Sequence, residues 1–352
     1  MVAKLKLAVA GIGNNITALM QGFDFYRHSR VDADAELVGI KNPFIGPLHV
    51  SDIEIVAGFD IDPDKIGKPM HQAIFAGTNN YPRIVNDLCS SETVVAAGLS
   101  GPDADITPIV AALKASKAEV LLYSLPTGLQ WAADAYARAA LAARVAFVNC
   151  TPELVARNPE TLAAFEQVGV PLIGDDLASH LGTSVVHRAL LGLLGERGLT
   201  LKSSYQLNLG GNADFKNLRV AGASKQQSKL NALAQDGVNT SLVEVIPSAG
   251  FVSHLMDNKV AYLNIEGQGW GGTPVSVDLK LRVQDSSNAA GVIIDLIRVA
   301  GVAGRKGLGG FNAAAVSCLK SPPGGHPSFS KEAIDSSIKG LFAQPDLAGA
   351  GA

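Results

Sequence analysis

The first half of the chain alternates short apolar runs with segments in which apolar residues recur every three or four positions. Lys4–Ala10 is predicted to be a buried strand, and the apolar stripe from Ile16 to Phe23 predicts a helix shortly after it. Repeated strand–helix units of this kind predict a mostly parallel sheet with right-handed crossovers. Further strands are predicted at Glu54–Asp60, Glu119–Ser124, Val145–Cys150 and Pro171–Gly174, and helices near Thr107–Lys117, Leu129–Arg144 and Pro159–Gly169.

After a predicted helix near Gly182–Arg197, the strand–helix alternation ends and most of the predicted elements are strands. A last helix, near Asn288–Ala303, is expected to return to the first sheet. We therefore expect an α/β protein in which residues 1–181 and 285–340 form one domain and residues 182–284 form an inserted α+β sheet domain. Residues 341–352 are rich in small residues and are expected to form a disordered tail. Strands of the inserted domain are predicted at Leu201–Leu209, Leu242–Pro247, Lys259–Glu266 and Val275–Val283, with a turn at Gly267–Gly272.

Composition excludes several classes of function. Of the 352 residues, 47% are hydrophobic and 17% are charged, which is typical of a globular protein with a large core or a buried subunit interface. The net charge is −3 and no basic stripe is present, so neither nucleic acid nor an anionic membrane is expected as a partner. Cys89, Cys150 and Cys318 lack metal-type or redox-type spacing, which predicts reduced thiols. No signal peptide or uncharged stretch of membrane-spanning length is apparent, so we expect a cytoplasmic location.

A glycine-rich turn, Gly11-Ile12-Gly13-Asn14-Asn15, joins the first strand to the first helix. Such a turn lets a pyrophosphate approach the backbone, and the free N–H groups of the helix N-terminus favour an anion. The turn predicts a Rossmann-type, doubly wound dinucleotide domain, although Ile16 stands where a third glycine is usual. Asp60 ends the second strand and is predicted to accept the ribose hydroxyls, with Asp62 as second candidate, which favours NAD over NADP. The long spacing from the turn to Asp60 predicts an insertion around Arg30–Ser51.

Polar segments also follow the later strands of this sheet. Ligands of open parallel sheets bind outside the carboxyl ends of the strands. Ser124–Gly128, Asn149–Pro152 and Gly174–Ser179 are therefore expected to face the cofactor. Besides the glycine turn and Asp60, the predicted cofactor-binding residues are Ser124, Asn149, Thr151, Asp176 and Asp285.

A second polar cluster lies in the inserted domain. Gln206–Phe215 and Ser224–Lys229 place amides, a carboxylate and two lysines around a glycine pair. Amides can bind hydroxyls and lysines can neutralise a phosphate, so the cluster predicts a polyhydroxy phosphate ligand. Lys259 and Lys320 stand next to apolar runs and are candidates for partial burial, which lowers the pKa of a lysine. Ordinary turn chemistry and solvated lysines are the alternative interpretation.

The order of these segments along the chain is shared with one known family. Together they resemble the myo-inositol-1-phosphate synthase family (inositol-3-phosphate synthases), in particular its shorter prokaryotic members. The resemblance covers the chain from about Lys4 to Pro323. It implies an NAD-dependent, redox-neutral cyclisation of D-glucose 6-phosphate to 1L-myo-inositol 1-phosphate in a homotetramer. The segments are Gly11–Asn15, Phe59–Asp62, Gly174–Leu177, Leu207–Asp214, Ser224–Lys229, Asp257–Lys259, Gln284–Ser286, Gly291–Leu296 and Leu319–Pro322.

The resemblance also implies roles for individual residues. Lys225 and Lys320 would act around the C5 oxygen of the substrate and its proton transfers. Lys259 would polarise the C1 carbonyl, and Lys229 would help to hold the phosphate. Preorganised ammonium groups suit this chemistry, because charge builds on an oxygen at each stage. Further candidates are the substrate-binding residues Ser179, Asn208, Asn212 and Asp214 and the catalytic residues Asp176, Asp257 and Asp285.

One position departs from the family pattern. Family members commonly carry a lysine where this chain has Ala178, directly before Ser179, and the segment from Asp214 to Lys225 looks shorter than in relatives. Loss of this cation leaves open a homologous cyclase that acts on another sugar phosphate, such as fructose 6-phosphate. An NAD-linked polyol dehydrogenase and a catalytically dead NAD-sensing module are further alternatives, and the retained lysines disfavour both.

The histidines give no metal signal. His180, His187 and His254 do not have the spacing of a ligand set, and satisfied or surface histidines are the favoured interpretation. The resemblance still leaves open a divalent or monovalent cation near the pyrophosphate and Asp176.

Overall fold

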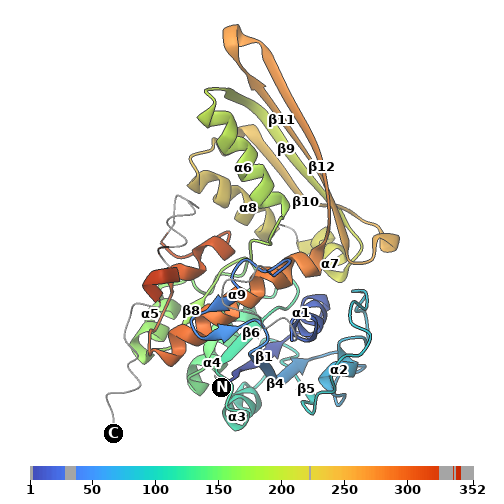
Figure 1. The fold of residues 1–352 in the computed structure, drawn as a ribbon, viewed down its shortest axis with the longest axis vertical. Helices are drawn as coiled ribbons and strands as arrows, with labels where there is room; N and C mark the ends of the chain where they lie inside the picture. Colours follow the sequence, from blue (N-terminus) through green and yellow to red (C-terminus); the bar gives the residue numbers. More distant parts are fainter. Residues whose placement is uncertain (1–2, 28–36, 222, 325–335, 337, 342–352) are drawn as a thin grey trace.

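The structure, a computed structural model, contains two large β-sheets connected by helices (Figure 1). It describes residues 3–27, 37–221, 223–324, 336 and 338–341. A six-stranded sheet forms the lower part of the molecule in this view, and a four-stranded sheet forms the upper part. The chain leaves the lower sheet after β8, builds the upper sheet, and returns through the helix α9.

The lower sheet is parallel throughout. β1 and β6 are neighbours, and β4 lies on the other side of β1, so the strand order reverses there. In sheets of this type the ligand crevice opens at this reversal, outside the carboxyl ends of the strands. In spatial order the strands are β5 (Val95–Ala97), β4 (Ile53–Asp60), β1 (Leu5–Ala10), β6 (Val120–Tyr123), β7 (Ala146–Asn149) and β8 (Leu172–Ile173).

Helices cover both faces of the lower sheet. On one face lie α1 (Asn14–Phe25) and α9 (Asp285–Arg305), and on the other lie α3 (Thr107–Ala115), α4 (Gln130–Ala143) and α5 (Pro159–Val168). Nearly all residues of the central strands are buried, as expected for parallel strands that are covered on both sides. The doubly wound Rossmann-type fold predicted from the sequence is confirmed.

The two ends of α5 show how the sequence determines where a helix begins and ends. The Asn158 side chain accepts the N–H groups of Glu160 and Thr161, and Pro159 occupies the first turn, where its missing N–H costs nothing. Gly169 ends the helix at a φ of 72°, a left-handed conformation that glycine adopts readily. The predicted helix near Pro159–Gly169 is therefore confirmed to within one residue.

The upper sheet carries the inserted segment. α6 and α8 cover one face of it and bury Leu191, Leu233 and Val245. β11 and β12 form a long antiparallel hairpin, and Trp270 is exposed at its turn. In spatial order the strands are β10 (Val243–Phe251), β9 (Thr200–Gly210), β11 (Asn258–Gln268) and β12 (Pro274–Gln284), and the covering helices are α6 (Thr183–Glu196) and α8 (Ala223–Gln235).

The helix α9 fastens several elements together. The Arg298 guanidinium is fully buried and donates hydrogen bonds to the backbone oxygens of Asn42 and Pro43 and to the Asp295 carboxylate. This holds the small hairpin of β2 (Phe44–Ile45) and β3 (Leu48–His49) against α9. By length and composition α9 could cross a membrane, but 72% of its apolar window is buried in the fold, as in the core helix of a soluble protein. The cytoplasmic location stays a prediction.

Several elements differ from the sequence-based expectation. α7 (Ala213–Ala221) and α8 occupy the polar segment after β9, where turns were the only structure considered. The hairpin of β2 and β3 lies in the expected insertion, of which residues 28–36 lie outside the described residues, as do residues 342–352 of the expected tail. β5 was not predicted, nor were the short helix α2 (Met70–Ala73) and the 3-10 turns at Thr240–Leu242, Ser253–Leu255 and Ala313–Cys318. The 3-10 turn at Trp270–Gly272 lies within the turn predicted at Gly267–Gly272.

Candidate active site

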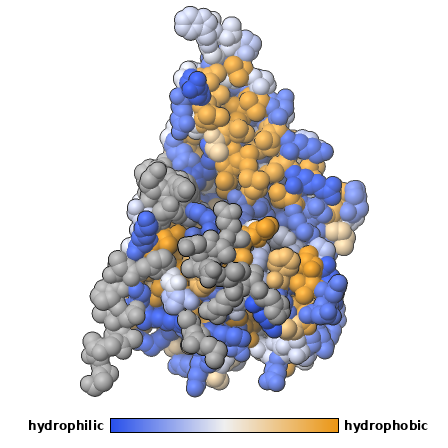
Figure 2. All heavy atoms as spheres, viewed as in Figure 1, coloured by the Kyte–Doolittle hydropathy of each residue, from blue (hydrophilic) through white to orange (hydrophobic). Residues whose placement is uncertain are grey.

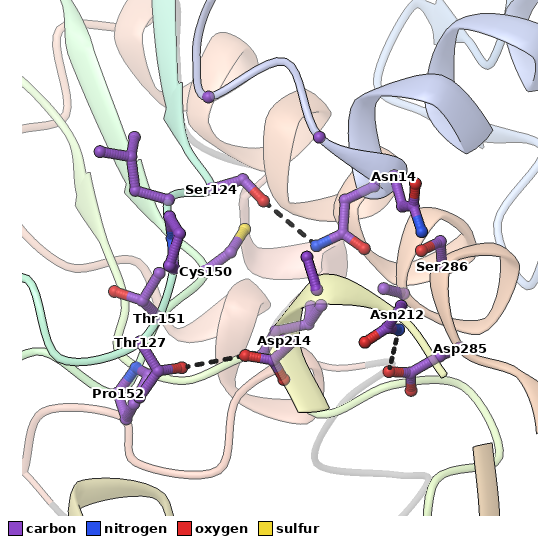
Figure 3. A pocket seen from close by; sticks show the side chains of 18 of the residues that line it. Asn14, Ser124, Thr127, Cys150, Thr151, Pro152, Asn212, Asp214, Asp285 and Ser286 are labelled. Atoms are coloured by element: carbon purple, nitrogen blue, oxygen red, sulfur yellow. Dashed lines mark hydrogen bonds between the residues drawn. The ribbon is translucent and has the colours of Figure 1, made fainter. Parts of the chain in front are cut away.

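A cavity of about 390 Å³ lies between the carboxyl ends of the lower sheet and the base of the upper sheet (Figure 3). Both halves of the chain contribute to its wall, so residues that are far apart in sequence meet there. The predicted site residues that line the cavity are Gly11, Gly13, Asn14, Asn15, Asp60, Ser124, Thr151, Asp176, Ser179, Asn212, Asp214, Lys225, Lys229, Lys259, Asp285 and Lys320.

The glycine turn forms one end of this cavity. Gly11 has a φ of +87°, and a Cβ atom there would stand 2.7 Å from the Ser124 carbonyl oxygen, so the turn requires glycine. Gly13 is the N-cap residue of α1 and supplies no side-chain acceptor, which leaves the first N–H groups of the helix available to an anion. The Asn15 side chain donates to Ser124 Oγ at 3.1 Å and ties the turn to the end of β6.

Asp60 lines the same end, but its oxygens are already in use. One oxygen accepts the N–H of Ile12 at 2.7 Å, and the other accepts those of Ile61 and Asp62 at 2.8 and 2.9 Å. Lys65 Nζ lies 3.5 Å from the first oxygen. The carboxylate therefore shapes the glycine turn, and a ribose hydroxyl would have to displace one of these donors. The ribose contact stays a prediction.

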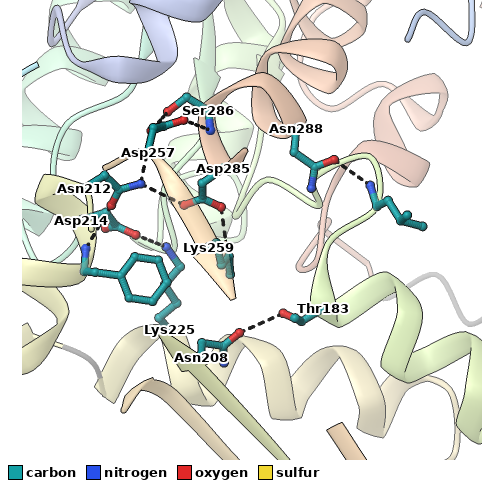
Figure 4. A network of polar contacts seen from close by, with 12 residues as sticks. Thr183, Asn208, Asn212, Asp214, Lys225, Asp257, Lys259, Asp285, Ser286 and Asn288 are labelled. Carbon is teal, nitrogen blue, oxygen red and sulfur yellow. Dashed lines mark hydrogen bonds and ion pairs between the residues drawn. The ribbon is translucent and has the colours of Figure 1, made fainter. Parts of the chain in front are cut away.

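Three of the four predicted cavity lysines are paired with carboxylates, and Figure 4 shows two of these pairs. Lys225 Nζ lies 2.7 Å from Asp214 Oδ2, and Lys259 Nζ lies 3.5 Å from Asp285 Oδ1. Four elements, α7, α8, β11 and the start of α9, bring these two pairs to one wall. The third pair joins Lys320 Nζ to Asp176 Oδ1 at 2.8 Å.

At these carboxylates, the ion pairs affect the pKa more than burial does. Burial alone would raise the pKa of Asp176, but Lys320 and Lys225 together hold it below its ordinary value. The pKa of Asp285 is lowered in the same way, because Lys259 and Lys225 overcome the effect of burial. Burial would lower the pKa of Lys225, but its carboxylate neighbours raise it instead. The cavity therefore holds fixed opposite charges at neutral pH.

Two of the cavity lysines, Lys320 and Lys229, have a lowered pKa instead. Burial lowers the pKa of Lys320, and Asp176 offsets only part of this effect. Lys229 is 4% exposed, and burial followed by repulsion from Lys259, Lys320 and Lys225 lowers its pKa well below the ordinary value. A lowered pKa makes it easier for an amine to give up its proton.

Asp257 connects the two halves of the site from behind the wall. Its Oδ1 accepts hydrogen bonds from Asn14 Nδ2 at 2.8 Å and Ser286 Oγ at 2.7 Å, and its Oδ2 accepts the Ser286 N–H. Asn212 Nδ2 lies 3.5 Å from Oδ1 and 3.2 Å from Asp285 Oδ2. Asp257 is fully buried and positions the residues around it, and its catalytic role stays a prediction.

Three further predicted residues also lie behind the cavity wall. The Ile12 side chain is in the hydrophobic core. Asn149 is fully buried and binds the Asp175 carboxylate and the Glu153 carbonyl oxygen. Asn208 is fully buried and donates to the Ile246 carbonyl oxygen. Ile12 and Asn149 were predicted from the glycine turn and the loop after β7, and Asn208 from the family resemblance. Their ligand contacts stay predictions.

Ala178 lies between two cavity-lining residues, Leu177 and Ser179. Its side chain is 6% exposed, and its N–H donates to the Cys318 carbonyl oxygen at 2.9 Å. This contact holds the segment after β8 against the loop that carries Lys320. The position adds no charge to a wall that already holds the Asp176–Lys320 pair.

No metal-binding group of three or more histidine, cysteine, aspartate or glutamate residues occurs in the described parts of the chain. His187 is buried in α6 and pairs with Ser204 Oγ at 2.7 Å, whereas His254 is exposed. His180 is partly buried on the loop before α6. The exposed His254 agrees with the surface interpretation, whereas His187 is only partly satisfied, because its Nδ1 is buried without a hydrogen-bond partner among the described residues.

Sequence reasoning missed several cavity and supporting residues. Ser228 donates to Asp176 Oδ2 at 2.5 Å, and Thr127 Oγ1 lies 3.5 Å from Asp214 Oδ1. Thr183 lines the cavity at the start of α6. The helical spacing of Lys225, Ser228 and Lys229 was the available signal, because positions i, i+3 and i+4 share one helix face.

The fold and the lysine-rich cavity together define a Rossmann-type enzyme, and comparisons narrow this class. A family model described as myo-inositol-1-phosphate synthase matches residues 182–286. The inositol-3-phosphate synthase of Mycolicibacterium smegmatis is 38% identical over 343 residues, which cover 91% of this chain and 93% of that protein. A protein named Ari2, known from a crystal structure, is 64% identical to this chain, and the two structures superpose with a TM-score of 0.87. The match covers 97% of this chain and 98% of the Ari2 chain. The inositol-3-phosphate synthase of Caenorhabditis elegans, at 19% identity and a TM-score of 0.74 over 98% of this chain and 87% of that chain, shares the fold.

This chain therefore belongs to the myo-inositol-1-phosphate synthase family. It is an enzyme of the inositol-3-phosphate synthase type, as the resemblance of its ordered segments implied.

Proposed function

We propose that the protein catalyses an NAD-dependent, redox-neutral cyclisation of a hexose 6-phosphate. The first candidate is D-glucose 6-phosphate, which would give 1L-myo-inositol 1-phosphate. The observation that carries this proposal is the meeting of four lysines from three segments in one cavity with the glycine turn of a dinucleotide fold. A simple dehydrogenase needs one acid–base group, and this site holds more.

The residues at the glycine turn fit NAD. The positive φ of Gly11 and the uncapped N-terminus of α1 form a backbone cradle for a pyrophosphate. Bound NAD would supply reversible hydride transfer at C5 of the sugar. Ser124 and Thr151 line the cavity beyond the turn and would contact the rest of the cofactor.

The lysines would manage the charge that develops on the substrate. With a ketone at C5 the C6 protons are acidic, and their loss places negative charge on the C5 oxygen. Lys225 and Lys320 would stabilise that charge, and Lys259 would polarise the carbonyl that C6 attacks. Each is held by a carboxylate, so little reorganisation is needed when the charge appears.

A second candidate substrate is fructose 6-phosphate, and one observation favours it. Ala178 replaces a lysine that the family commonly carries beside the site. Identity to the mycobacterial synthase is 38%, so most positions differ between the two proteins and a change of substrate is compatible with the shared family. With this substrate C6 would attack the C2 ketone and form a five-membered carbocycle. The reaction is again an isomerisation, with no net oxidation.

One experiment separates these functions. The purified protein and NAD are incubated in three parallel reactions with glucose 6-phosphate, fructose 6-phosphate or mannose 6-phosphate. The products are identified by NMR. A cyclase gives a carbocyclic phosphate without net absorbance at 340 nm, and deuterium at C5 returns to the product. Turnover of fructose 6-phosphate alone would assign the second candidate. Stoichiometric NADH release would assign a dehydrogenase, and no turnover of any of the three would overturn the proposal.

Self-association accompanies the proposed function, with a homotetramer as the expected state. Val277 and Leu279 lie on the helix-bearing face of the upper sheet, because β12 pairs them with the buried Ile265 and Leu263 of β11. They stay partly exposed, since α6 packs on β9 and β11. Figure 2 shows apolar atoms gathered over this upper region. A second copy would cover this apolar strip.

A further inference from the structure

The peptide group between Thr127 and Gly128 is held from both sides. Its carbonyl oxygen, on Thr127, accepts a hydrogen bond from Asn217 Nδ2 at 2.7 Å, and its N–H, on Gly128, donates to Glu153 Oε1 at 2.7 Å. Asn217 lies on α7, which packs against β10 of the upper sheet, whereas Glu153 lies between β7 and α5 of the lower domain. Two short hydrogen bonds in opposite directions fix the plane of this peptide between the two parts of the molecule.

The carboxylate of Glu153 is only half satisfied. Glu153 is 4% exposed, and its second oxygen, Oε2, has no hydrogen-bond partner among the described residues. A buried carboxylate oxygen without a donor lowers the stability of the fold. We therefore attribute the presence of a glutamate at this position to its contact with Gly128 rather than to a gain in stability.

Asn217 connects the same peptide to the charged end of the cavity. Asp214 lies one helical turn before Asn217 on α7, so the two side chains share a face of the helix. Asp214 Oδ2 lies 2.7 Å from Lys225 Nζ, and Asp214 Oδ1 lies 3.5 Å from Thr127 Oγ1 (Figure 3). The side chains of Asp214 and Lys225 are 30% and 18% exposed, so burial alone does not fix this ion pair. An anchor for α7 next to Asp214 supplies the missing constraint.

We propose that Asn217 and Glu153 are positioning residues that hold the Thr127–Gly128 peptide and, through it, keep Asp214 and Lys225 in place. The inference rests on the proposed function, in which Lys225 stabilises the charge on the C5 oxygen. Neither Asn217 nor Glu153 is among the described residues that line the cavity, so both act through the ion pair. A loop of the lower domain thereby sets the position of a lysine of the upper domain.

Amide hydrogen exchange tests these contacts without any substrate. In Glu153→Leu the Gly128 N–H loses its acceptor, and in Asn217→Asp the donor to the Thr127 carbonyl becomes a carboxylate of the same shape. The Gly128 amide, followed by mass spectrometry with electron-transfer fragmentation, should exchange at least tenfold faster in both variants than in the wild type. Lys216→Ala, an exposed change on α7, is the control and should exchange like the wild type. Wild-type exchange in either test variant would overturn the proposal.

Turnover assays test the positioning role, with whichever hexose 6-phosphate the wild type converts. The value of kcat should fall at least tenfold in Glu153→Leu and in Asn217→Asp. The Kd for NAD, measured by calorimetry, should stay within threefold, because Asn15 holds Ser124 of the same loop separately. Glu153→Gln keeps an oxygen acceptor for Gly128 and should retain most of kcat. A Glu153→Gln variant as slow as Glu153→Leu would contradict the proposal.

The double variant distinguishes positioning from general damage to the fold. Glu153 and Asn217 act on one peptide, so Glu153→Leu combined with Asn217→Asp should lose little more kcat than the worse single variant. Losses that multiply would contradict the proposal, because two unrelated structural defects add in free energy. Asn217 is partly exposed, so Asn217→Asp should fold even if Glu153→Leu does not, and its exchange rate and kcat alone can then overturn the proposal.

The two kinds of measurement also separate this inference from the proposed function. A wild type that converts none of the three sugar phosphates would refute the proposed function, and the exchange rates would still decide whether the peptide is held. Conversely, a wild type that turns over while the variants keep both exchange rate and kcat would refute this inference alone.

Discussion

The two ends of the cavity differ in the groups that line them. At the lower sheet, backbone N–H groups and neutral side chains such as Asn15 and Ser124 face the ligand space. At the upper sheet, paired charges such as Lys225–Asp214 and Lys259–Asp285 face it. A backbone cradle depends mainly on the path of the chain, whereas paired charges depend on each side chain. Single substitutions at the upper end should therefore cost more activity than those at the lower end.

The largest expected effect is at Lys225. Lys225→Ala removes a charged donor and leaves Asp214 unpaired, so kcat should fall by two or more orders of magnitude, or about 3 kcal/mol. NAD affinity, measured by calorimetry, should stay within twofold. Lys280→Ala on the exposed face of β12 is the matched control and should retain full activity. A Lys225→Ala variant that keeps the wild-type kcat would contradict the expectation that substitutions at the upper end cost the most activity.

Acid sensitivity should arise at the upper end. Burial lowers the pKa of His187 from 6.5 to about 4, so below pH 6.5 the unfolded chain binds a proton that the folded protein refuses. Stability should therefore fall between pH 6.5 and pH 4, by about 2–3 kcal/mol from this residue. Urea unfolding of His187→Gln should show a flatter pH dependence over this range. The exposed His254→Gln should follow the wild type, and identical profiles for all three proteins would contradict the assignment.

At the lower end a single side chain should matter less. Asp60→Asn retains the size of the side chain but loses the charge that faces the Ile12 N–H and Lys65, so NAD affinity should fall by about 1–2 kcal/mol. Discrimination against NADP should weaken in parallel. Asp64→Asn, an exposed change four residues away, serves as the control. Calorimetry that finds unchanged affinity for NAD would show that Asp60 only shapes the turn.

The smallest effect concerns association. Leu279→Ser places a polar group on the apolar strip of β12, so the oligomer should dissociate at about tenfold higher protein concentration. Light scattering across micromolar concentrations measures the change, and Lys280→Ser on the opposite face is the control. A wild-type protein that is monomeric throughout this range would exclude the expected homotetramer.

The lower sheet was largely predictable because its signals are local. Lys4–Ala10 and the glycine turn reveal a strand and a turn from adjacent residues, and the strand spans agree closely with the structure. α7 and α8 were missed because the glycine pair before them and their polar surface are typical of a turn, and their packing against β10 depends on distant residues. The family resemblance identified the four lysines, but no sequence pattern could show that, in the described part of the chain, Lys229 is the one of these four without an ion pair.

Asn14 begins α1, which covers the lower sheet, and Asp257 directly precedes β11 of the upper sheet. The two residues nevertheless share a hydrogen bond of 2.8 Å, and Ser286 of α9 completes the junction. A buried carboxylate that loses these donors would be left unsatisfied, so neither sheet can open without a cost to the other. We expect heat denaturation to proceed as one cooperative calorimetric transition rather than two. Ligand that stiffens the glycine turn would then raise the melting temperature of the whole molecule, including the distant β11–β12 hairpin.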